Sequence, residues 1–303
     1  MSQKPMKHIA SIGFASLALM LAMLACALPR STVAPTLEMI VEPTIQPTRT
    51  EPIPKLASPP APPATPTVPE TGSGSIVLHQ PFAIIVAFSG PETGTGSALF
   101  KPMMQAARKA IEDFGPIHGF GVNLITYNDT CTEAGGTNVA GQIAADERIV
   151  AVLGPVCSAA VRGALPSLED AHVVMISASA TDPELSPSGP SVFHRTLLDD
   201  DQVQLLGYPS QIYIEDLPSV QIWLSDFAAW GGTLLETGLN HFAPYQYDAT
   251  LILLRAINNS SQALNDGSLV IDREALRAAV RATIAYPGVT GNITFENDGD
   301  RVP

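Results

Sequence analysis

The stretch IVAVLGPVCSAAVRGALPSLEDAHVVMISASATDP, residues 149–183, decides the fold. Residues 149–153 and 173–176 are short apolar runs rich in β-branched side chains. Such runs are typical of strands that are covered by helices on both faces of a parallel sheet. The segment between them, 159–170, is expected to be a helix. The stretch therefore predicts one strand–helix–strand unit of an α/β protein.

The same alternation extends toward the amino terminus. Two further units precede this one, strand 82–88 with helix 98–114 and strand 122–127 with helix 137–146. Short loops join these elements, as in doubly wound sheets. The sequence therefore predicts the fold class α/β, with a doubly wound parallel sheet.

Small and polar residues follow each of the four predicted strands. In an open parallel sheet, ligands bind outside the carboxyl ends of the strands. The loops at these ends are rich in Ser, Thr, Gly or Asn, and they are 89–96, 128–133, 154–158 and 177–181. This edge of the sheet is the predicted ligand-binding site.

The pattern is less regular after Gln202. Helices are expected at 217–230, 247–264 and 272–284, and a short strand is expected at 291–295. Asp272 is expected to cap the third of these helices, because an aspartate side chain accepts hydrogen bonds from free N–H groups at a helix start.

The amino terminus has the pattern of a secretory signal. Two lysines precede an apolar run at 12–24, which ends beside Cys26. This pattern predicts that residues 1–26 are a lipoprotein-type signal peptide and that Cys26 carries the lipid. An ordinary signal peptide cleaved beside Cys26, or an uncleaved anchor, remains an alternative, although the apolar run is short for a membrane span.

Residues 27–75 are rich in Pro, Thr, Ala and Glu and have no aromatic side chain. Such a composition cannot bury enough apolar surface to offset the entropy lost on ordering. Closely spaced prolines favour an extended polyproline II conformation. We therefore expect a disordered tether that holds a folded domain away from a membrane.

The composition limits the classes of function. The formal net charge of −13 argues against binding to nucleic acids, whose phosphates it repels. The six histidines show no metal-ligand spacing, and the chain has no P-loop lysine and no nucleophile elbow. We therefore expect neither an enzyme nor a bound cofactor or metal.

Two of the three cysteines are expected to pair with each other. With Cys26 assigned to the lipid, Cys131 and Cys157 form an even pair in an exported protein, where an oxidising compartment favours a disulfide. The rival interpretation is a free nucleophilic Cys157. No histidine lies in a sequence context that would orient it as the base for such a nucleophile.

Several motifs carry a resemblance to a known family. They are GPVCSAAV at 154–161, SASATDPELS at 177–186, FHRTLLDDDQ at 193–202, YDA at 247–249 and GVTGNITF at 288–295. On these motifs the chain resembles the type I periplasmic binding proteins. Among them it resembles the Leu/Ile/Val receptors of ABC transporters.

The resemblance implies a role for each residue in the two central motifs. It implies that Ser158, supported by Cys157, holds the carboxylate of an amino acid, together with free N–H groups at the helix start. It also implies that Ser179, Ala180 and Thr181 meet the carboxylate and the ammonium group. The alternatives are that Ser158 only caps a helix and that Thr181 only caps a turn.

The first loop adds Ser89 and Thr95 to the predicted ligand-binding residues. The family often has an aromatic residue where this chain has Thr95, and that residue covers the side chain of the ligand. Its loss opens the site to a smaller or more polar amino acid. Arg195 and Asp200, in the third motif, are expected to be structural rather than ligand-binding.

The resemblance also implies a missing part. Residues 76–202 and 217–303 correspond to the first lobe of the family with its closing helices. Between these blocks the family has a second α/β lobe, whereas this chain has only a shortened crossover at 203–216. The second lobe is therefore expected to be largely absent. Closure of two lobes about a hinge, which buries the ligand, is then lost together with the acidic residue that pairs with the ammonium group.

The resemblance predicts a non-enzymatic, extracytoplasmic solute-binding protein, anchored to the cell membrane only through its lipid. It would capture an amino acid of the branched-chain type for the permease of an ABC transporter. Two alternatives remain open. One is a ligand sensor or a protein-interaction lobe, and the other is a degenerate, truncated receptor without transport activity.

Overall fold

The computed structural model describes residues 74–94, 96–186, 191–208, 210–236 and 240–303. The predicted signal peptide, the predicted lipidation site Cys26 and the predicted tether up to residue 73 lie outside these residues. Thr95 lies outside them as well.

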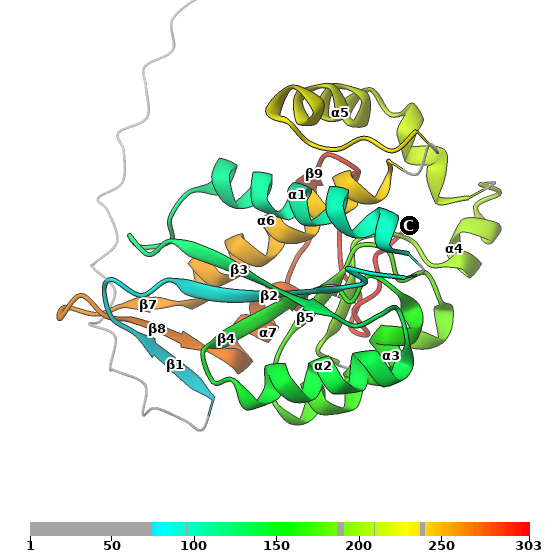
Figure 1. Cartoon of the computed structure of the whole chain (residues 1–303). Coiled ribbons are helices and arrows are strands. Elements are labelled where there is room, and N and C mark those ends of the chain that lie inside the picture. Colours follow the sequence, from blue (N-terminus) through cyan, green and yellow to red (C-terminus); the bar gives the residue numbers. More distant parts are fainter. Residues whose placement is uncertain (1–73, 95, 187–190, 209, 237–239) are drawn as a thin grey trace, which may run out of the picture. The chain divides into compact units, whose positions relative to one another are not determined.

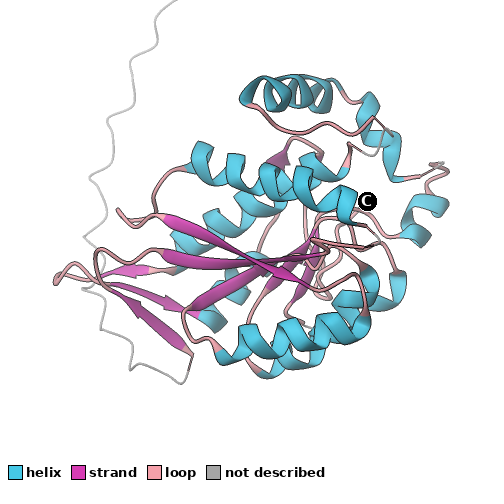
Figure 2. Cartoon of the chain, in the orientation of Figure 1, coloured by secondary structure: helices cyan, strands magenta, loops and turns pink. Residues whose placement is uncertain are grey.

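The described residues contain a five-stranded parallel sheet, shown in Figures 1 and 2. Its strands stand in the order β3-β2-β4-β5-β6. Their bounds are β2 Ile84–Gly90, β3 Val122–Asn128, β4 Ile149–Leu153, β5 Met175–Ser177 and β6 Phe193–Arg195. The prediction of a doubly wound parallel sheet is therefore confirmed.

Helices follow the strands in alternation. Their bounds are α1 Ser97–Phe114, α2 Glu133–Ala145, α3 Ser158–Asp170, α4 Asp200–Leu205, α5 Pro218–Trp230, α6 Phe242–Ser260 and α7 Arg273–Arg281. Two short 3₁₀ helices lie at Pro183–Leu185 and Gln211–Asp216.

Two layers of helices enclose the sheet. α1 and α6 lie on one face, and α2 and α3 lie on the other (Figure 1). Successive side chains of a strand point to opposite faces. In β2, Val86 and Phe88 accordingly join the cluster that includes the buried residues of α1 and α6, whereas Ala87 joins the cluster of α2 and α3. Because both faces are covered, the strands carry apolar side chains on both sides.

The sequence patterns did not predict a small second sheet. In it, β1 Ser75–Leu78 pairs antiparallel with β8 Leu269–Asp272, and β8 pairs with β7 Gln262–Ala263. A hydrogen bond of 3.0 Å from Ser75 Oγ to Asp272 Oδ2 joins two segments that lie 197 residues apart in sequence. The strands of this sheet are too short to show a period, and their partners are set by the rest of the fold.

The short strand predicted at 291–295 is present as β10 Gly291–Ile293, which ends earlier than predicted. It forms a hairpin with β9 Tyr286–Gly288, which the sequence patterns did not predict.

The helix predicted at 247–264 has the wrong bounds. α6 begins at Phe242 and ends at Ser260. Pro244 lies in its first turn, where proline is tolerated because the N–H that it lacks has no partner inside the helix. The chain then becomes extended at Ser261 and enters β7. The predicted cap of α7 is confirmed, since Asp272 Oδ1 accepts a hydrogen bond of 2.8 Å from the Ala275 N–H.

α2 and α3 approach each other closely because glycines line their contact. A Cβ atom on Gly163 would lie 1.9 Å from the carbonyl oxygen of Glu133. A Cβ atom on Gly136 would lie 2.0 Å from the carbonyl oxygen of Ala160. Gly141, also in α2, has no atom within 4 Å of its would-be Cβ. The contact therefore depends on the absence of a side chain at 136 and 163.

We expect Gly163→Ala to lower the free energy of unfolding by about 1–3 kcal/mol, because the new methyl group must push two backbones apart. Gly141→Ala is the matched control and should raise this free energy by about 0.5–1 kcal/mol, because alanine is the better helix former. Urea unfolding of both variants, followed by circular dichroism, measures the difference. Equal stability of the two variants would contradict the close contact.

Candidate functional site

The loops at the carboxyl ends of the strands lie along one edge of the sheet. The parallel register pairs Gly90 at the end of β2 with Asn128 at the end of β3. It also pairs Phe88 with Leu153 at the end of β4, and Ser177 at the end of β5 with Arg195. The four predicted loops therefore meet at one edge, as the sequence predicted.

The start of α3 is the first component of this edge. Cys157 is the N-cap residue, and its side chain makes no capping hydrogen bond. Ser158 is the first helical residue, and its Oγ accepts a hydrogen bond of 3.3 Å from the Asp182 N–H. The alternative that Ser158 caps the helix is therefore wrong. The first N–H groups of a helix have no partner inside it, so this end attracts an anion.

The loop after β5 is tied to the loop before α3. Ser177 Oγ donates a hydrogen bond of 2.7 Å to the Pro155 carbonyl and accepts one of 3.2 Å from the Ala180 N–H. Ser179 Oγ donates to the Val156 carbonyl at 2.6 Å. These hydrogen bonds fix the loop. Because the Ser179 hydroxyl donates its proton to the Val156 carbonyl, it cannot donate that proton to a ligand. Ser179 stays partly exposed, whereas Ala180 is fully buried.

Thr181 and Asp200 form the next part of the edge. Thr181 Oγ1 donates a hydrogen bond of 3.0 Å to Asp200 Oδ2, and the Asp200 N–H donates one of 3.0 Å to the Thr181 carbonyl. The alternative that Thr181 caps a turn is wrong, because Asp182 caps the following 3₁₀ turn by accepting from the Glu184 N–H. The sequence interpretation treated Asp200 as structural, but its carboxylate is exposed beside Thr181. The hydrogen-bond partner could not be read from the sequence.

Ser89 lies below the surface of the edge. Its side chain is almost fully buried, and its hydroxyl donates a hydrogen bond of 2.8 Å to Asp129 Oδ2. Asp129 Oδ1 accepts from the Cys131 N–H at 2.9 Å. Burial raises the pKa of Asp129, and the hydrogen bonds from the Cys131 N–H and the Ser89 hydroxyl oppose this rise. Ser89 therefore supports the loop after β3.

A disulfide joins two of the loops. Cys131 follows β3 and Cys157 precedes α3, and their Cα atoms lie 5.3 Å apart. A Cβ atom on Gly96 would lie 3.5 Å from each of the two sulfur atoms, so the first loop packs against the same bond. This arrangement agrees with the expected pairing and leaves no free thiol at Cys157.

Arg195 anchors the edge from inside. Its fully buried guanidinium donates to Asp300 Oδ1 at 2.5 Å, to Ser186 Oγ at 2.7 Å and to the Asp182 carbonyl at 2.9 Å. A longer hydrogen bond of 3.3 Å reaches the Ala180 carbonyl. The expected structural role of Arg195 is therefore confirmed.

Ser179, Ala180 and Thr181 follow one another in the loop after β5. Two hydrogen bonds tie this loop to the segment that holds Cys157 and Ser158, from Ser179 Oγ to the Val156 carbonyl and from the Asp182 N–H to Ser158 Oγ. Thr181 adjoins Asp200 on the other side. Within the described part of the chain, no group of three or more His, Cys, Asp or Glu side chains is arranged to hold a metal ion. The chemistry available is hydrogen bonding to a small polar ligand, with N–H groups on one side and a carboxylate on the other.

The sequence matches proteins of known function over this region. Residues 83–211 match the family model described as periplasmic binding protein. The Leu/Ile/Val-binding protein of Escherichia coli K12 is 34% identical over 121 residues, which are 40% of this chain and 32% of that protein. The leucine-specific-binding protein of Salmonella typhimurium LT2 is 36% identical over 124 residues, which are 40% and 32% of the two chains. The sequence match thus spans about a third of these relatives.

Solved structures share the fold. A leucine-binding protein from Thermotoga maritima MSB8 aligns with a TM-score of 0.58 at 16% identity, over 73% of this chain and 93% of the other. A branched-chain amino acid transporter substrate-binding protein from Streptococcus pneumoniae, in complex with isoleucine, aligns with a TM-score of 0.54 at 14% identity, over 73% and 94%. At such identities the likeness concerns the fold alone.

We expect removal of the disulfide by Cys131→Ala together with Cys157→Ala to lower the free energy of unfolding. The bond closes a loop across a sequence separation of 26 residues. A loop of this length predicts a loss of about 3 kcal/mol, because the unfolded chain gains conformational freedom. Urea unfolding with and without a reductant measures the effect. The double variant is the control, since reductant should leave its midpoint unchanged.

Proposed function

We propose that this chain is a type I periplasmic binding protein of the branched-chain amino acid type, which captures an amino acid outside the cytoplasm for an ABC transporter. The match of residues 83–211 to the periplasmic binding protein family supports this proposal. The ligand-binding residues that we propose at the carboxyl edge of the sheet are Ser158, Thr181 and Asp200, and we propose that Ser179 and the buried Ala180 shape the loop that carries Thr181. Cys157 supports Ser158 through the disulfide.

One observation carries the proposal. The start of α3, which attracts an anion, and the exposed carboxylate of Asp200, which attracts a cation, contact the same short loop. The Asp182 N–H donates to Ser158 Oγ at 3.3 Å, and Oγ1 of the preceding Thr181 donates to Asp200 Oδ2 at 3.0 Å. An amino acid zwitterion carries the complementary pair of charges. We propose that its carboxylate binds at the start of α3 and its ammonium group binds at Asp200.

The site that we propose is one-sided. We assign residues 76–202 and 217–303 to the first lobe of the family and residues 203–216 to a shortened crossover, with α4 crossing the boundary at 202. A second lobe would bury the ligand from the other side. Without it, the ligand keeps more of its surface in water, and its affinity should be lower than that of a two-lobed receptor.

A second candidate function is a sensor or protein-interaction lobe. Its support is the exposed apolar surface at the end of α4, where Leu205 is 85% exposed and Leu206 is 45% exposed. These residues lie close in sequence to Asp200, beside the proposed ligand site. An interaction lobe would bury them against another protein.

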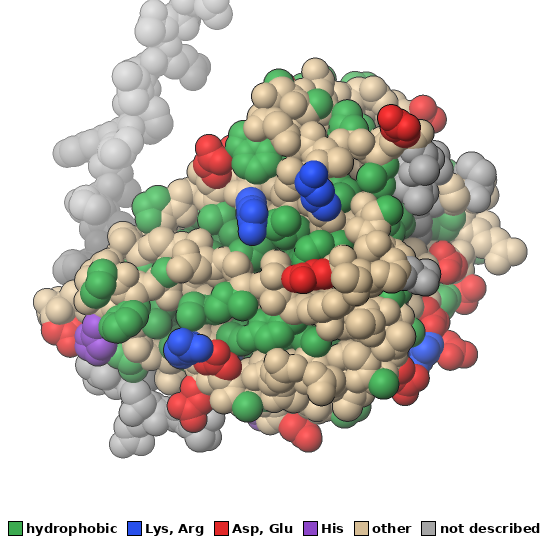
Figure 3. All heavy atoms as spheres, in the orientation of Figure 1, with side chains coloured by type: hydrophobic (Ala, Val, Ile, Leu, Met, Phe, Trp, Pro, Cys, Tyr) green, Lys and Arg blue, Asp and Glu red, His purple; other side chains and the backbone are tan. Residues whose placement is uncertain are grey.

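The location that we propose is outside the cytoplasmic membrane, with a lipid on Cys26 as the anchor. No helix in the described part of the chain is long and apolar enough to cross a bilayer. On the face drawn in Figure 3, lysine and arginine side chains are scattered and form no extended basic patch. This distribution fits a small-molecule ligand better than a nucleic acid.

We expect calorimetric titration of the purified chain with each of the twenty amino acids to give saturable heat for at least one of them. Asp200→Asn should weaken that binding by about tenfold or more, because the ammonium group loses a charged partner. Thr181→Val, which removes the hydroxyl that orients Asp200, should weaken it as well. The matched control is Asp201→Asn, since Asp201 is an exposed neighbour in α4 and does not bind Thr181.

The absence of heat from every amino acid, in a folded and monomeric sample, would reject the proposed receptor function. Unchanged binding in Asp200→Asn would reject only the assignment of the ammonium group. A folded sample that forms oligomers without binding any amino acid would favour the interaction lobe.

A further inference from the structure

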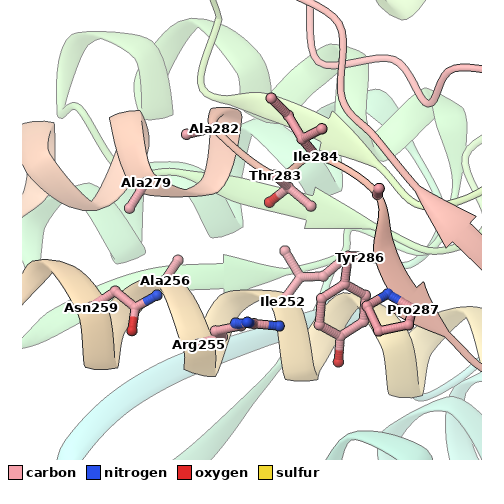
Figure 4. Close-up of a pocket in the computed structure, with 11 residues that line it drawn as sticks. Ile252, Arg255, Ala256, Asn259, Ala279, Ala282, Thr283, Ile284, Tyr286 and Pro287 are labelled. Atoms are coloured by element: carbon pink, nitrogen blue, oxygen red, sulfur yellow. The ribbon is translucent and has the colours of Figure 1, made fainter. Parts of the chain in front are cut away.

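A pocket of about 270 Å³ lies between α6, α7 and the start of β9. Figure 4 shows the side chains that line it. They come from two segments, 252–259 in α6 and 279–287 at the end of α7 and the start of β9. We call this cavity the α6–α7 pocket. It contains none of the ligand-binding residues proposed above, and it lies outside residues 83–211 that match the family model.

The polar side of the pocket is formed by Arg255. Its side chain is exposed, and no carboxylate of the described residues lies within ion-pair distance of it. Its guanidinium lies over the ring of Tyr286, with 5.7 Å from Cζ to the ring centroid (Figure 4). This contact orients the guanidinium without using its N–H groups for a carboxylate. An exposed arginine held in this way retains the fork of donors that binds a carboxylate in bidentate fashion.

The charge at the pocket comes from Arg255 itself. No acidic side chain of the described residues lines the pocket. The arginines of the neighbouring α7 are engaged elsewhere, since Arg273 donates to the Ile149 carbonyl at 2.9 Å and Arg281 donates to the Ser191 carbonyl at 2.8 Å. A cation that faces a pocket without an acidic neighbour raises the local concentration of small anions.

Asp248, a buried acidic residue of α6, accepts hydrogen bonds from the segment that joins β9 and β10. Asp248 Oδ2 accepts hydrogen bonds from the Thr290 N–H at 2.9 Å and the Thr290 hydroxyl at 2.7 Å, while Oδ1 accepts from the Val289 N–H at 2.8 Å. Asp248 therefore does not neutralise Arg255 through an ion pair. The positive charge of Arg255 remains available to a ligand.

Small aliphatic side chains form the walls of the pocket, and Asn259, Thr283 and Tyr286 add polar groups to its lining. Ile252 and Ala256 lie on α6, and Ala279 and Ala282 lie across from them at the end of α7. Ile284 forms part of the rim and is 77% exposed. An aliphatic side chain so exposed gains from any apolar group that covers it. The pocket thus combines one cationic group and several neutral polar groups with aliphatic walls.

We propose that the α6–α7 pocket binds a small monocarboxylate with an apolar body, whose carboxylate pairs with Arg255 and whose body lies against the exposed Ile284. A volume of about 270 Å³ is enough for a benzoate-sized or branched short-chain acid and too small for a drug-sized ligand. The pocket shares no residue with the amino acid site that we propose at the sheet edge, so either proposal can be rejected while the other stands.

The experiment uses the purified full chain with benzoate as the probe, followed by saturation-transfer NMR over a concentration series. We expect saturable binding that weakens by about tenfold or more in Arg255→Gln, because one charged, bidentate contact is lost. Ala282→Phe, which fills the pocket from its rim, should also remove binding. Benzyl alcohol, the neutral analogue, should bind more weakly than benzoate by a similar factor.

Two matched controls make the outcome specific. Arg108→Gln removes an exposed arginine from the middle of α1 and should leave benzoate binding unchanged. Thr181→Val, at the sheet edge, should leave it unchanged as well. Circular dichroism and thermal unfolding establish that each variant is folded. The proposal is overturned if the unchanged chain shows no saturable binding, if Arg255→Gln binds benzoate as well as the unchanged chain, or if Thr181→Val alone abolishes the binding.

Discussion

The buried guanidinium of Arg195 is the interaction on which the proposed ligand site depends. It joins β6 to Asp300 near the carboxyl end of the chain and to Ser186 and the Asp182 carbonyl in the loop after β5. A buried charge is stable only when it is paired and its hydrogen bonds are made. The loop that carries Thr181 therefore keeps its conformation only while residues more than a hundred positions apart stay in contact.

Two further constraints act on the same edge. The disulfide holds the loop after β3 to the start of α3, and Ser177 and Ser179 hold the loop after β5 to the same segment. The hydroxyls of Ser89 and Ser179, which the resemblance assigns to the ligand, thus donate their hydrogen bonds to groups within the protein. The groups left for a ligand are the free N–H groups at the start of α3, Thr181 and the carboxylate of Asp200. This small set is consistent with a rigid but one-sided site.

The two proposed sites differ in how they are built. The edge of the sheet places a helix start beside a carboxylate, which suits a zwitterion. The α6–α7 pocket places an arginine beside aliphatic walls, which suits an anion with an apolar body. The first site is built by loops that the parallel sheet gathers, whereas the second is built by closing helices that pack beside one another. A chain that binds at both would respond to two different ligands.

The sequence by itself determined the sheet and its edge. Apolar runs such as 149–153 can be buried only between two layers of helices, and the carboxyl ends of parallel strands must then meet along one side. It also indicated that Arg195 is structural and that Cys131 pairs with Cys157. The tertiary structure alone decided the partners of short or polar segments. Two examples join residues that are distant in sequence: β1 pairs with β8, and Asp200 contacts Thr181. Two others depend on how the helices pack: α6 begins at Phe242, and aliphatic walls surround Arg255. Local periodicity carries no information about such contacts, because the fold of the backbone decides which distant side chains lie within contact distance of each other.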